Sequence, residues 1–198
     1  MKPEISTISL SDTIGPMPIL TEIHRCEGVD IHGRTIHRKA VRAVIARGNN
    51  LLMIYSSAVG DYKFPGGGVD QGESHEQALR REVQEECGMS LASVGDEIGS
   101  VLEFDQPVEK EFDAFRMVSH YYRCDVLDGA GSQKLDDYEK DLGFTPIWIN
   151  IDQAIQANEQ LLDSDVPPEW LKREIFVLKY LKQTLFAKRR KPCLNSRR

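Results

Sequence analysis

The chain lacks the features that would indicate a membrane protein or a secreted protein. It has no run of about 18 apolar residues, the length that a membrane-spanning helix needs. Its N-terminal segment lacks the charged start and apolar run of a signal peptide. Its four cysteines form no C-x-x-C pair and no zinc-type spacing, which is typical of free thiols in a reducing compartment. We therefore expect a cytoplasmic protein with no membrane partner.

Positive charge is also scarce. The chain has 25 Lys and Arg residues against 31 Asp and Glu residues, which gives a net charge of −6. Because six of the positive residues lie within 187–198, the rest of the chain is more acidic still. An acidic body does not attract the nucleic-acid backbone over long range, so we expect no nucleic-acid partner. We expect the basic tail at 187–198 to be a disordered, solvated terminus.

The 198 residues fit one compact domain, and a composition of 40% hydrophobic and 28% charged residues is ordinary for a soluble protein. We expect an N-terminal extension at 1–38, irregular at first and then a hairpin that turns at Gly33, followed by the main domain at 39–186. Within that domain the patterns predict two strands joined at 48–50 and strands at 98–104, 115–126 and 144–151. They also predict a loop at 134–143, a helix at 152–162 capped by Asp152, and a last helix from 167 to 186.

The segment 65–89, PGGGVDQGESHEQALRREVQEECGM, reads as a loop followed by a helix. Three consecutive glycines exclude a regular element and let the backbone come close to a ligand. Ser74 is a suitable N-cap, and Gln77 completes a capping box. Gly88 suits the position that follows a helix. We therefore predict a helix over 75–87.

Three carboxylates cluster on this helix. Glu82, Glu85 and Glu86 follow the spacing i, i+3, i+4, which places them on neighbouring turns along one flank of the apolar stripe. Like charges held together repel, and oxygen ligands of this kind are typical of Mg²⁺ sites. The same run on an isolated helix is often only a solvated face, but the glycine loop and the caps favour a site.

The segment resembles the Nudix box. Gly67, Glu73, the run Arg81-Glu82-Val83, Glu85-Glu86 and Gly88-Met89 reproduce its spacing without a departure. The resemblance implies an α/β (α+β) fold, the Nudix-type α/β/α sandwich around a mixed central sheet. It also implies hydrolysis of a nucleoside diphosphate linked to another moiety, with Mg²⁺ or Mn²⁺ as cofactor.

Roles for individual residues follow from the same resemblance. Glu82, Glu85 and Glu86 look like the metal-binding carboxylates, with the carbonyl of Gly66 or Gly67 completing the shell. The catalytic set would also include Arg81, which orients a glutamate, and Glu139 as a candidate general base. A box glutamate, or one of two acids in an earlier loop, is the alternative base. The motif's structural residues would be Gly67, Gly88 and Glu73, which braces the loop; the two loop acids are Glu109 and Glu111.

Substrate contacts are predicted from position. Arg42 and Arg116 lie on strands from which they can reach a diphosphate, although surface arginines are equally common. Tyr62 and Phe64 flank the glycine loop and are candidates for stacking on a nucleobase, although core packing is common for such residues.

The substrate itself is not specified by any motif outside the box. A nucleoside triphosphate or a nucleotide-sugar-type diphosphate is preferred as the small-molecule substrate. A nucleotide-sensing module without turnover is one alternative. A diphosphate isomerase is another, but neither Cys87 nor Cys124 is placed well for it. The N-terminal extension and the last helix are candidates for a homodimer interface.

Overall fold

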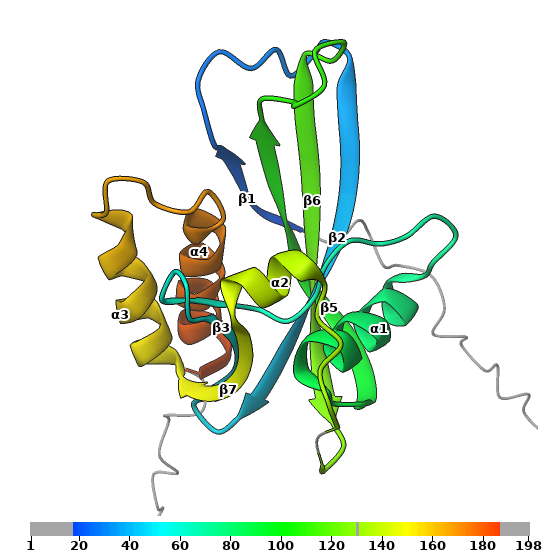
Figure 1. Ribbon diagram of the computed structural model, residues 1–198, viewed down its shortest axis with the longest axis vertical. Coiled ribbons are helices and arrows are strands. Elements are labelled where there is room, and N and C mark those ends of the chain that lie inside the picture. The colour runs from blue at the N-terminus through cyan, green and yellow to red at the C-terminus, as the bar shows by residue number, and fades with distance from the viewer. Residues whose placement is uncertain (1–17, 130, 187–198) are drawn as a thin grey trace, which may run out of the picture.

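The computed structural model describes residues 18–129 and 131–186 (Figure 1). The predicted tail at 187–198 and all but the last residue of the irregular start at 1–18 lie outside the described residues. No helix in the described part is long and apolar enough to cross a membrane.

Seven strands form the central sheet, in the order β1-β5-β6-β2-β3-β4, and β7 also pairs with β3. The pairs β1–β5 and β2–β6 are parallel and the remaining pairs are antiparallel, so the sheet is mixed, as predicted. The strands are β1 Ile19–His24, β2 Thr35–Arg47, β3 Asn50–Ser56, β4 Asp61–Lys63, β5 Leu91–Asp105, β6 Ala114–Val126 and β7 Phe144–Asn150.

Helices cover both faces of this sheet (Figure 1). One side carries α1 (His75–Cys87), and the other carries α3 (Ile151–Leu162) and α4 (Leu171–Leu181), which continues as the short π-helix Lys182–Phe186. A further short helix, α2 (Asp137–Leu142), precedes β7. The arrangement is the α/β/α sandwich that the resemblance implied.

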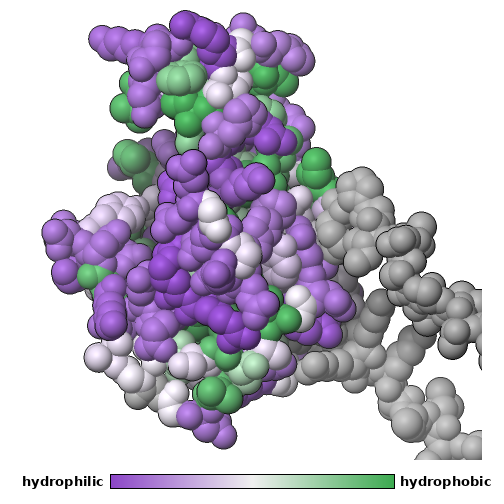
Figure 2. Space-filling view, turned by 90° about the vertical axis from the view of Figure 1, so that its right-hand side faces the viewer, coloured by the Kyte–Doolittle hydropathy of each residue, from purple (hydrophilic) through white to green (hydrophobic). Residues whose placement is uncertain are grey.

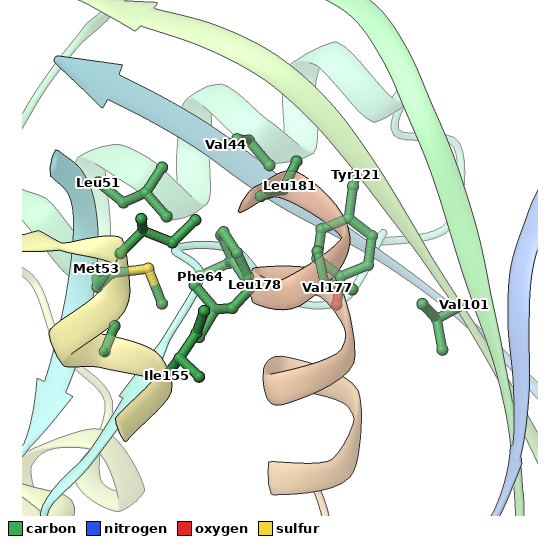
Figure 3. Close-up of a cluster of buried hydrophobic side chains, with 12 residues drawn as sticks. Val44, Leu51, Met53, Phe64, Val101, Tyr121, Ile155, Val177, Leu178 and Leu181 are labelled. Carbon is green, nitrogen blue, oxygen red and sulfur yellow. The ribbon is translucent and has the colours of Figure 1, made fainter. Parts of the chain in front are cut away.

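Two hydrophobic clusters hold the layers together, and alternate residues of β2 divide between them. Val41, Ala43 and Ile45 face α1, whereas Val44 faces α3 and α4. In the second cluster Tyr121 packs edge-on against Phe64, with ring centroids 5.5 Å apart (Figure 3). This alternation, the ordinary period of a strand, decides which residues of β2 and β6 face the space between the sheet and α4.

The predicted hairpin at 19–38 is wrong. β1 pairs with β5 and β2 pairs with β6, so two strands separate the supposed partners. The Gly33 turn packs on β6 instead, since a Cβ at Gly33 would lie 2.5 Å from that of Asp113, and the Asp113 N–H donates to the Arg34 carbonyl. The chain therefore continues into β2 beside β6.

Four further boundaries differ from the predictions. β5 begins at Leu91, seven residues before the predicted start at 98. Residues 134–143 were predicted as a loop but contain α2, because Asp136 and Glu139 form a reciprocal capping box. Asn150 rather than Asp152 caps α3, through a bond from the Asp152 N–H to its side chain. α4 begins at Leu171, after Pro167 and Pro168, and has no side-chain cap.

The surface gives no support to a particular partner face. Figure 2 shows that hydrophilic side chains cover most of the face it presents. The large exposed hydrophobic side chains in the described part are scattered along the chain, at Ile19, Val108, Leu127, Tyr138, Ile147, Leu162 and Val166. The homodimer interface stays a prediction.

Candidate active site

One cavity, of about 640 Å³, is lined by all of the predicted catalytic residues. The glycine loop, the glutamates of α1, the cavity-facing arginines of β2 and the segment around α2 line it together. α1 forms as predicted: Ser74 and Gln77 make a reciprocal capping box, and Gly88 ends the helix in the left-handed conformation at φ 65°. The capping residues and glycines of 65–89 therefore predict the helix that carries the three glutamates.

The glutamates differ in their exposure to solvent. The relative exposure of Glu82 is 8% and that of Glu86 is 5%, while Glu85 is half-buried. The Gly66 N–H donates to Glu86 Oε2 at 2.7 Å. A Cβ at Gly67 would lie 2.6 Å from Glu82 Oε1, so a larger residue at this position would displace the carboxylate.

Burial makes ionisation of these carboxylates costly. It raises the pKa of Glu82, against the opposing effect of Arg81. It raises the pKa of Glu86 to about 8, and repulsion from Glu82 and Glu139 acts in the same direction. The hydrogen bond from Gly66 and the charge of Arg42 offset only part of this. A cation among the carboxylates would stabilise their charged forms.

Arg81 connects the loop to two of the glutamates. Its Nε and Nη2 donate to the two oxygens of Glu73, at 3.0 and 2.8 Å. Its Nη1 donates to Glu82 Oε1 at 2.7 Å and to Glu85 Oε2 at 3.3 Å. Its Nη2 also donates to the Gly68 carbonyl at 3.0 Å. The hydrogen bonds from Arg81 lower the pKa of Glu73, so the pair remains charged and fixes the glycine loop against α1.

Glu139 lies in the same cavity, brought there by α2. The backbone N–H of Asp136 donates to its Oε2 at 2.9 Å, which fixes the carboxylate at the start of the helix. Burial raises the pKa of Glu139, and Asp136 and Glu85 add to the effect. The alternatives Glu109 and Glu111 are exposed in the connection between β5 and β6, where the strands extend beyond the helices (Figure 1), and neither lines the cavity.

The family model of the NUDIX domain matches residues 36–171. The chain belongs to the NUDIX family of hydrolases. A Nudix hydrolase from Nitrosomonas europaea has the same fold at 20% identity, with a TM-score of 0.52 over 80% of this chain and 94% of that one. A MutT Nudix hydrolase from Burkholderia pseudomallei is 24% identical, with a TM-score of 0.46 over 59% of this chain and 85% of that one. No curated protein matches the chain.

The carboxylate oxygens of the Nudix box are ligands of the type that a divalent ion prefers. Three carboxylates that line one cavity are hard oxygen ligands, and the close approach of Gly67 to Glu82 aligns the loop with them. Within 18–129 and 131–186, however, no three acidic, histidine or cysteine side chains are gathered at metal-binding geometry. Arg81 and the Gly66 N–H each donate to one oxygen, of Glu82 and Glu86 respectively, so the second oxygen of each carboxylate is left to face an ion.

The carbonyls considered as further ligands already accept hydrogen bonds. Arg42 Nη1 donates to the Gly66 carbonyl, and the Val41 N–H donates to that of Gly67 at 2.9 Å. Arg42 itself faces the cavity, as expected for a strand residue opposite Val41 and Ala43. Its Nε is buried and has no partner among the described residues.

Two of the predicted substrate contacts, Arg116 and Tyr62, do not line this cavity. Phe115 and Met117 line the cavity, so Arg116 between them points to the opposite face of β6. Tyr62 lines a separate groove beside β7 and α3. Phe64 does reach the cavity wall, but it is fully buried against Tyr121.

Two basic residues of the cavity, Arg38 and Lys63, were missed. Arg38 precedes Arg42 by four positions on one strand, and this even spacing was a signal that the two share a face. No sequence pattern marks Lys63, because β4 comes to the cavity only through its pairing with β3.

Proposed function

We propose that this Nudix protein hydrolyses the diphosphate bond of a nucleoside diphosphate linked to another moiety, in a reaction that depends on Mg²⁺ or Mn²⁺. One observation carries the proposal: four carboxylates from α1 and α2 line the same cavity as basic residues of β2 and β4 that form no ion pair within the described part of the chain. Acidic groups suit the ion and the water, while basic groups suit the phosphates.

Glu82, Glu85 and Glu86 would hold the ion. When bound, it would offset the negative charge of the diphosphate and increase the acidity of water. Arg81 would keep Glu82 and Glu85 in position from the loop side, through bonds it already makes in this structure. Arg42, on the facing strand, would bind a phosphate oxygen of the substrate.

Glu139 would take the proton of the attacking water. Its Oε2 accepts the Asp136 N–H, which leaves Oε1 to receive the proton. Its raised pKa brings it closer to neutral pH, where a general base works best. Glu86, whose pKa is also raised, is the alternative base within the box.

We further propose a small-molecule nucleotide substrate, without a nucleic-acid partner, and a cytoplasmic site of action. The net charge of −6 supports the first part, since an acidic protein does not attract a nucleic-acid backbone over long range. The four cysteines without metal or redox spacing support the second.

Nucleotide sensing without turnover is the second candidate. It is favoured by the lack of a preassembled ligand triad among the described residues. A diphosphate isomerase is disfavoured. Cys87 of α1 and Cys124 of β6 are buried between α1 and the sheet, and burial raises the pKa of both thiols. No cysteine of the described part lines the cavity.

Release of phosphate and nucleotide from a substrate panel tests these alternatives. The panel holds dNTPs, ATP, ADP-ribose, NADH, coenzyme A, nucleotide sugars and dinucleoside polyphosphates, with Mg²⁺, with Mn²⁺ or with a chelator. We expect metal-dependent hydrolysis of one class, and a loss of about 100-fold or more in Glu85→Gln and Glu86→Gln. Glu76→Gln is the matched control, because Glu76 lies on α1 but pairs with Arg80 at the surface.

The outcomes separate the three functions. Binding of a nucleotide without products would favour the sensor, and a rearranged substrate would favour the isomerase. Full activity in both Glu85→Gln and Glu86→Gln would contradict the metal assignment.

A further inference from the structure

The basic residues of the cavity fall into two groups. Arg25 and Arg173 are neutralised by neighbouring carboxylates, with ion pairs of 2.6–3.4 Å to Glu103, Asp105, Glu169 and Glu174. Arg81 is likewise paired, with Glu73, Glu82 and Glu85. Arg38, Arg42, Lys63 and the exposed Lys134 line the cavity and form no ion pair with any residue of 18–129 or 131–186. Arg25 and Arg173 hold α4 and the β1 end to the sheet, whereas Arg38 and Arg42 of β2 and Lys63 of β4 present charges without an ion-pair partner in the described part to the same cavity. We call these three residues the basic row.

Arg38 and Arg42 are the two members of the basic row that lie on β2. They lie four residues apart on one face of β2, a backbone separation of about 13 Å. The guanidinium of Arg38 lies along the glycine loop, since a Cβ at Gly68 would be 3.4 Å from its Nη2. Arg38 is exposed at the mouth of the cavity; desolvation lowers its pKa, repulsion by Arg42 lowers it further, and attraction by Glu82 opposes both. Two cations are thus held close enough to repel each other.

Lys63 continues the row on β4. Its Nζ lies 4.2 Å from the ring centroids of both Phe144 and Trp170. Trp170 Nε1 donates a hydrogen bond to Asp61 Oδ2 at 2.6 Å. This bond fixes the indole ring against which the Lys63 ammonium lies. Burial lowers the pKa of Lys63, the carboxylates of Asp61, Glu174 and Glu86 oppose this, and the charge of Arg42 lowers the pKa further. Arg42 therefore acts electrostatically on both other cations.

We propose that Arg38, Arg42 and Lys63 form a binding site for a chain of at least three phosphates. This inference rests on the proposed function and deepens it by naming the substrate class. Like charges gathered in one cavity without ion-pair partners in the described part repel one another, and an anionic ligand relieves that repulsion. A diphosphate joined to a neutral group has too few charged groups for the row, whereas a polyphosphate offers one phosphate to each cation.

The hydrolytic test compares ATP with ADP-ribose, which share adenosine diphosphate and differ in whether the third group is a phosphate or a neutral sugar. We expect a higher kcat/KM for ATP. In Arg38→Met and Lys63→Met, the kcat/KM for ATP falls by about tenfold or more, and that for ADP-ribose by less than about threefold. Lys39→Met is the matched control, because it removes a charge from the opposite, exposed face of β2 and changes neither value. Equal losses on both substrates, or a preference for ADP-ribose in the wild type, would overturn the inference.

A binding test keeps this inference separate from the proposed function. Affinities for inorganic tripolyphosphate and pyrophosphate are measured by calorimetry in a chelating buffer, where no turnover is needed. We expect the wild type to bind tripolyphosphate about tenfold more tightly than pyrophosphate. In Arg38→Met this ratio of affinities is expected to fall below about threefold. Equal affinities in the wild type would overturn the polyphosphate site even if the protein is a hydrolase. A difference in affinity of about tenfold without hydrolysis of any substrate in the panel would support the polyphosphate site and overturn the proposed hydrolytic function.

Discussion

The Gly66 N–H donates to the Glu86 carboxylate at 2.7 Å, in a loop whose backbone at Gly66 has φ 131°. Only glycine adopts this conformation readily, and a Cβ there would collide with the Val41 carbonyl. The bond therefore joins the β2 face, the glycine loop and the box helix at one point. It holds in place a carboxylate that would otherwise be buried without a partner.

This geometry predicts different effects for two neighbouring loop glycines. We expect Gly66→Ala to lower the free energy of unfolding by about 2–4 kcal/mol, because backbone strain and a steric clash coincide. We expect Gly67→Ala to cost less stability but to displace Glu82, and so to reduce turnover by about 100-fold. Chemical denaturation and kcat measurements test both.

Gly72→Ala is the control for the loop. Gly72 also has a positive φ, of 85°, but no atom lies within 4 Å of its missing Cβ. Its replacement is expected to cost about 1 kcal/mol and to leave turnover unchanged. An equal loss of stability in Gly66→Ala and Gly72→Ala would show that the Val41 contact does not matter.

Glu139 offers a substitution that separates chemistry from structure. A glutamine can accept the Asp136 N–H as the glutamate does, so Glu139→Gln should keep the capping box and the melting temperature. It cannot take a proton, and we expect kcat to fall by about 10²–10⁴-fold. The acidic limb of the kcat–pH profile should disappear with it. Glu109→Gln, in the connection beyond the cavity, should behave as the wild type; unchanged kcat in Glu139→Gln would assign the base to the box.

The sequence predicts the box helix better than it predicts the sheet. The α1 box could be located because its caps, glycines and spacing all lie within 25 residues of local sequence, from 65 to 89. The pairing of β1 with β5 could not, because strand neighbours depend on tertiary packing rather than on sequence distance. Arg116 illustrates the same limit: alternation predicts that it opposes Phe115, but only the packed helices reveal which face of β6 lines the cavity.

A network of titratable groups beneath the start of α1 predicts a dependence of stability on pH. His75 Nδ1 lies 2.7 Å from the Tyr122 hydroxyl, which donates to Glu97, and Glu97 also bonds His120 at 2.8 Å. Burial lowers the pKa of His75, and the charges of His120 and Lys39 lower it further, against the opposing effect of Glu97. His75 is therefore neutral in the fold at pH values where the unfolded chain begins to protonate it.

The sign follows from this difference in proton binding. Below the ordinary value of 6.5, the unfolded state binds more protons than the folded state, so stability falls as the pH falls. We expect the Tm to drop between about pH 7.5 and 5.5, and His75→Gln to flatten that slope. His32→Gln, in the exposed turn before β2, is the control and should keep the wild-type slope. A steep slope that persists in His75→Gln would assign the effect to other groups.

Arg81 tests whether fixed geometry or charge alone organises the box. Its guanidinium makes paired bonds to Glu73 and reaches Glu82 and Glu85 with a third nitrogen, a pattern that a single ammonium cannot reproduce. We expect Arg81→Lys to keep the net charge and most of the stability but to lower kcat by about 10- to 100-fold. Arg80→Lys removes a comparable guanidinium that pairs with Glu76 at the surface, and its kcat should not change. If Arg81→Lys retained full activity, charge alone would be enough to position the two glutamates.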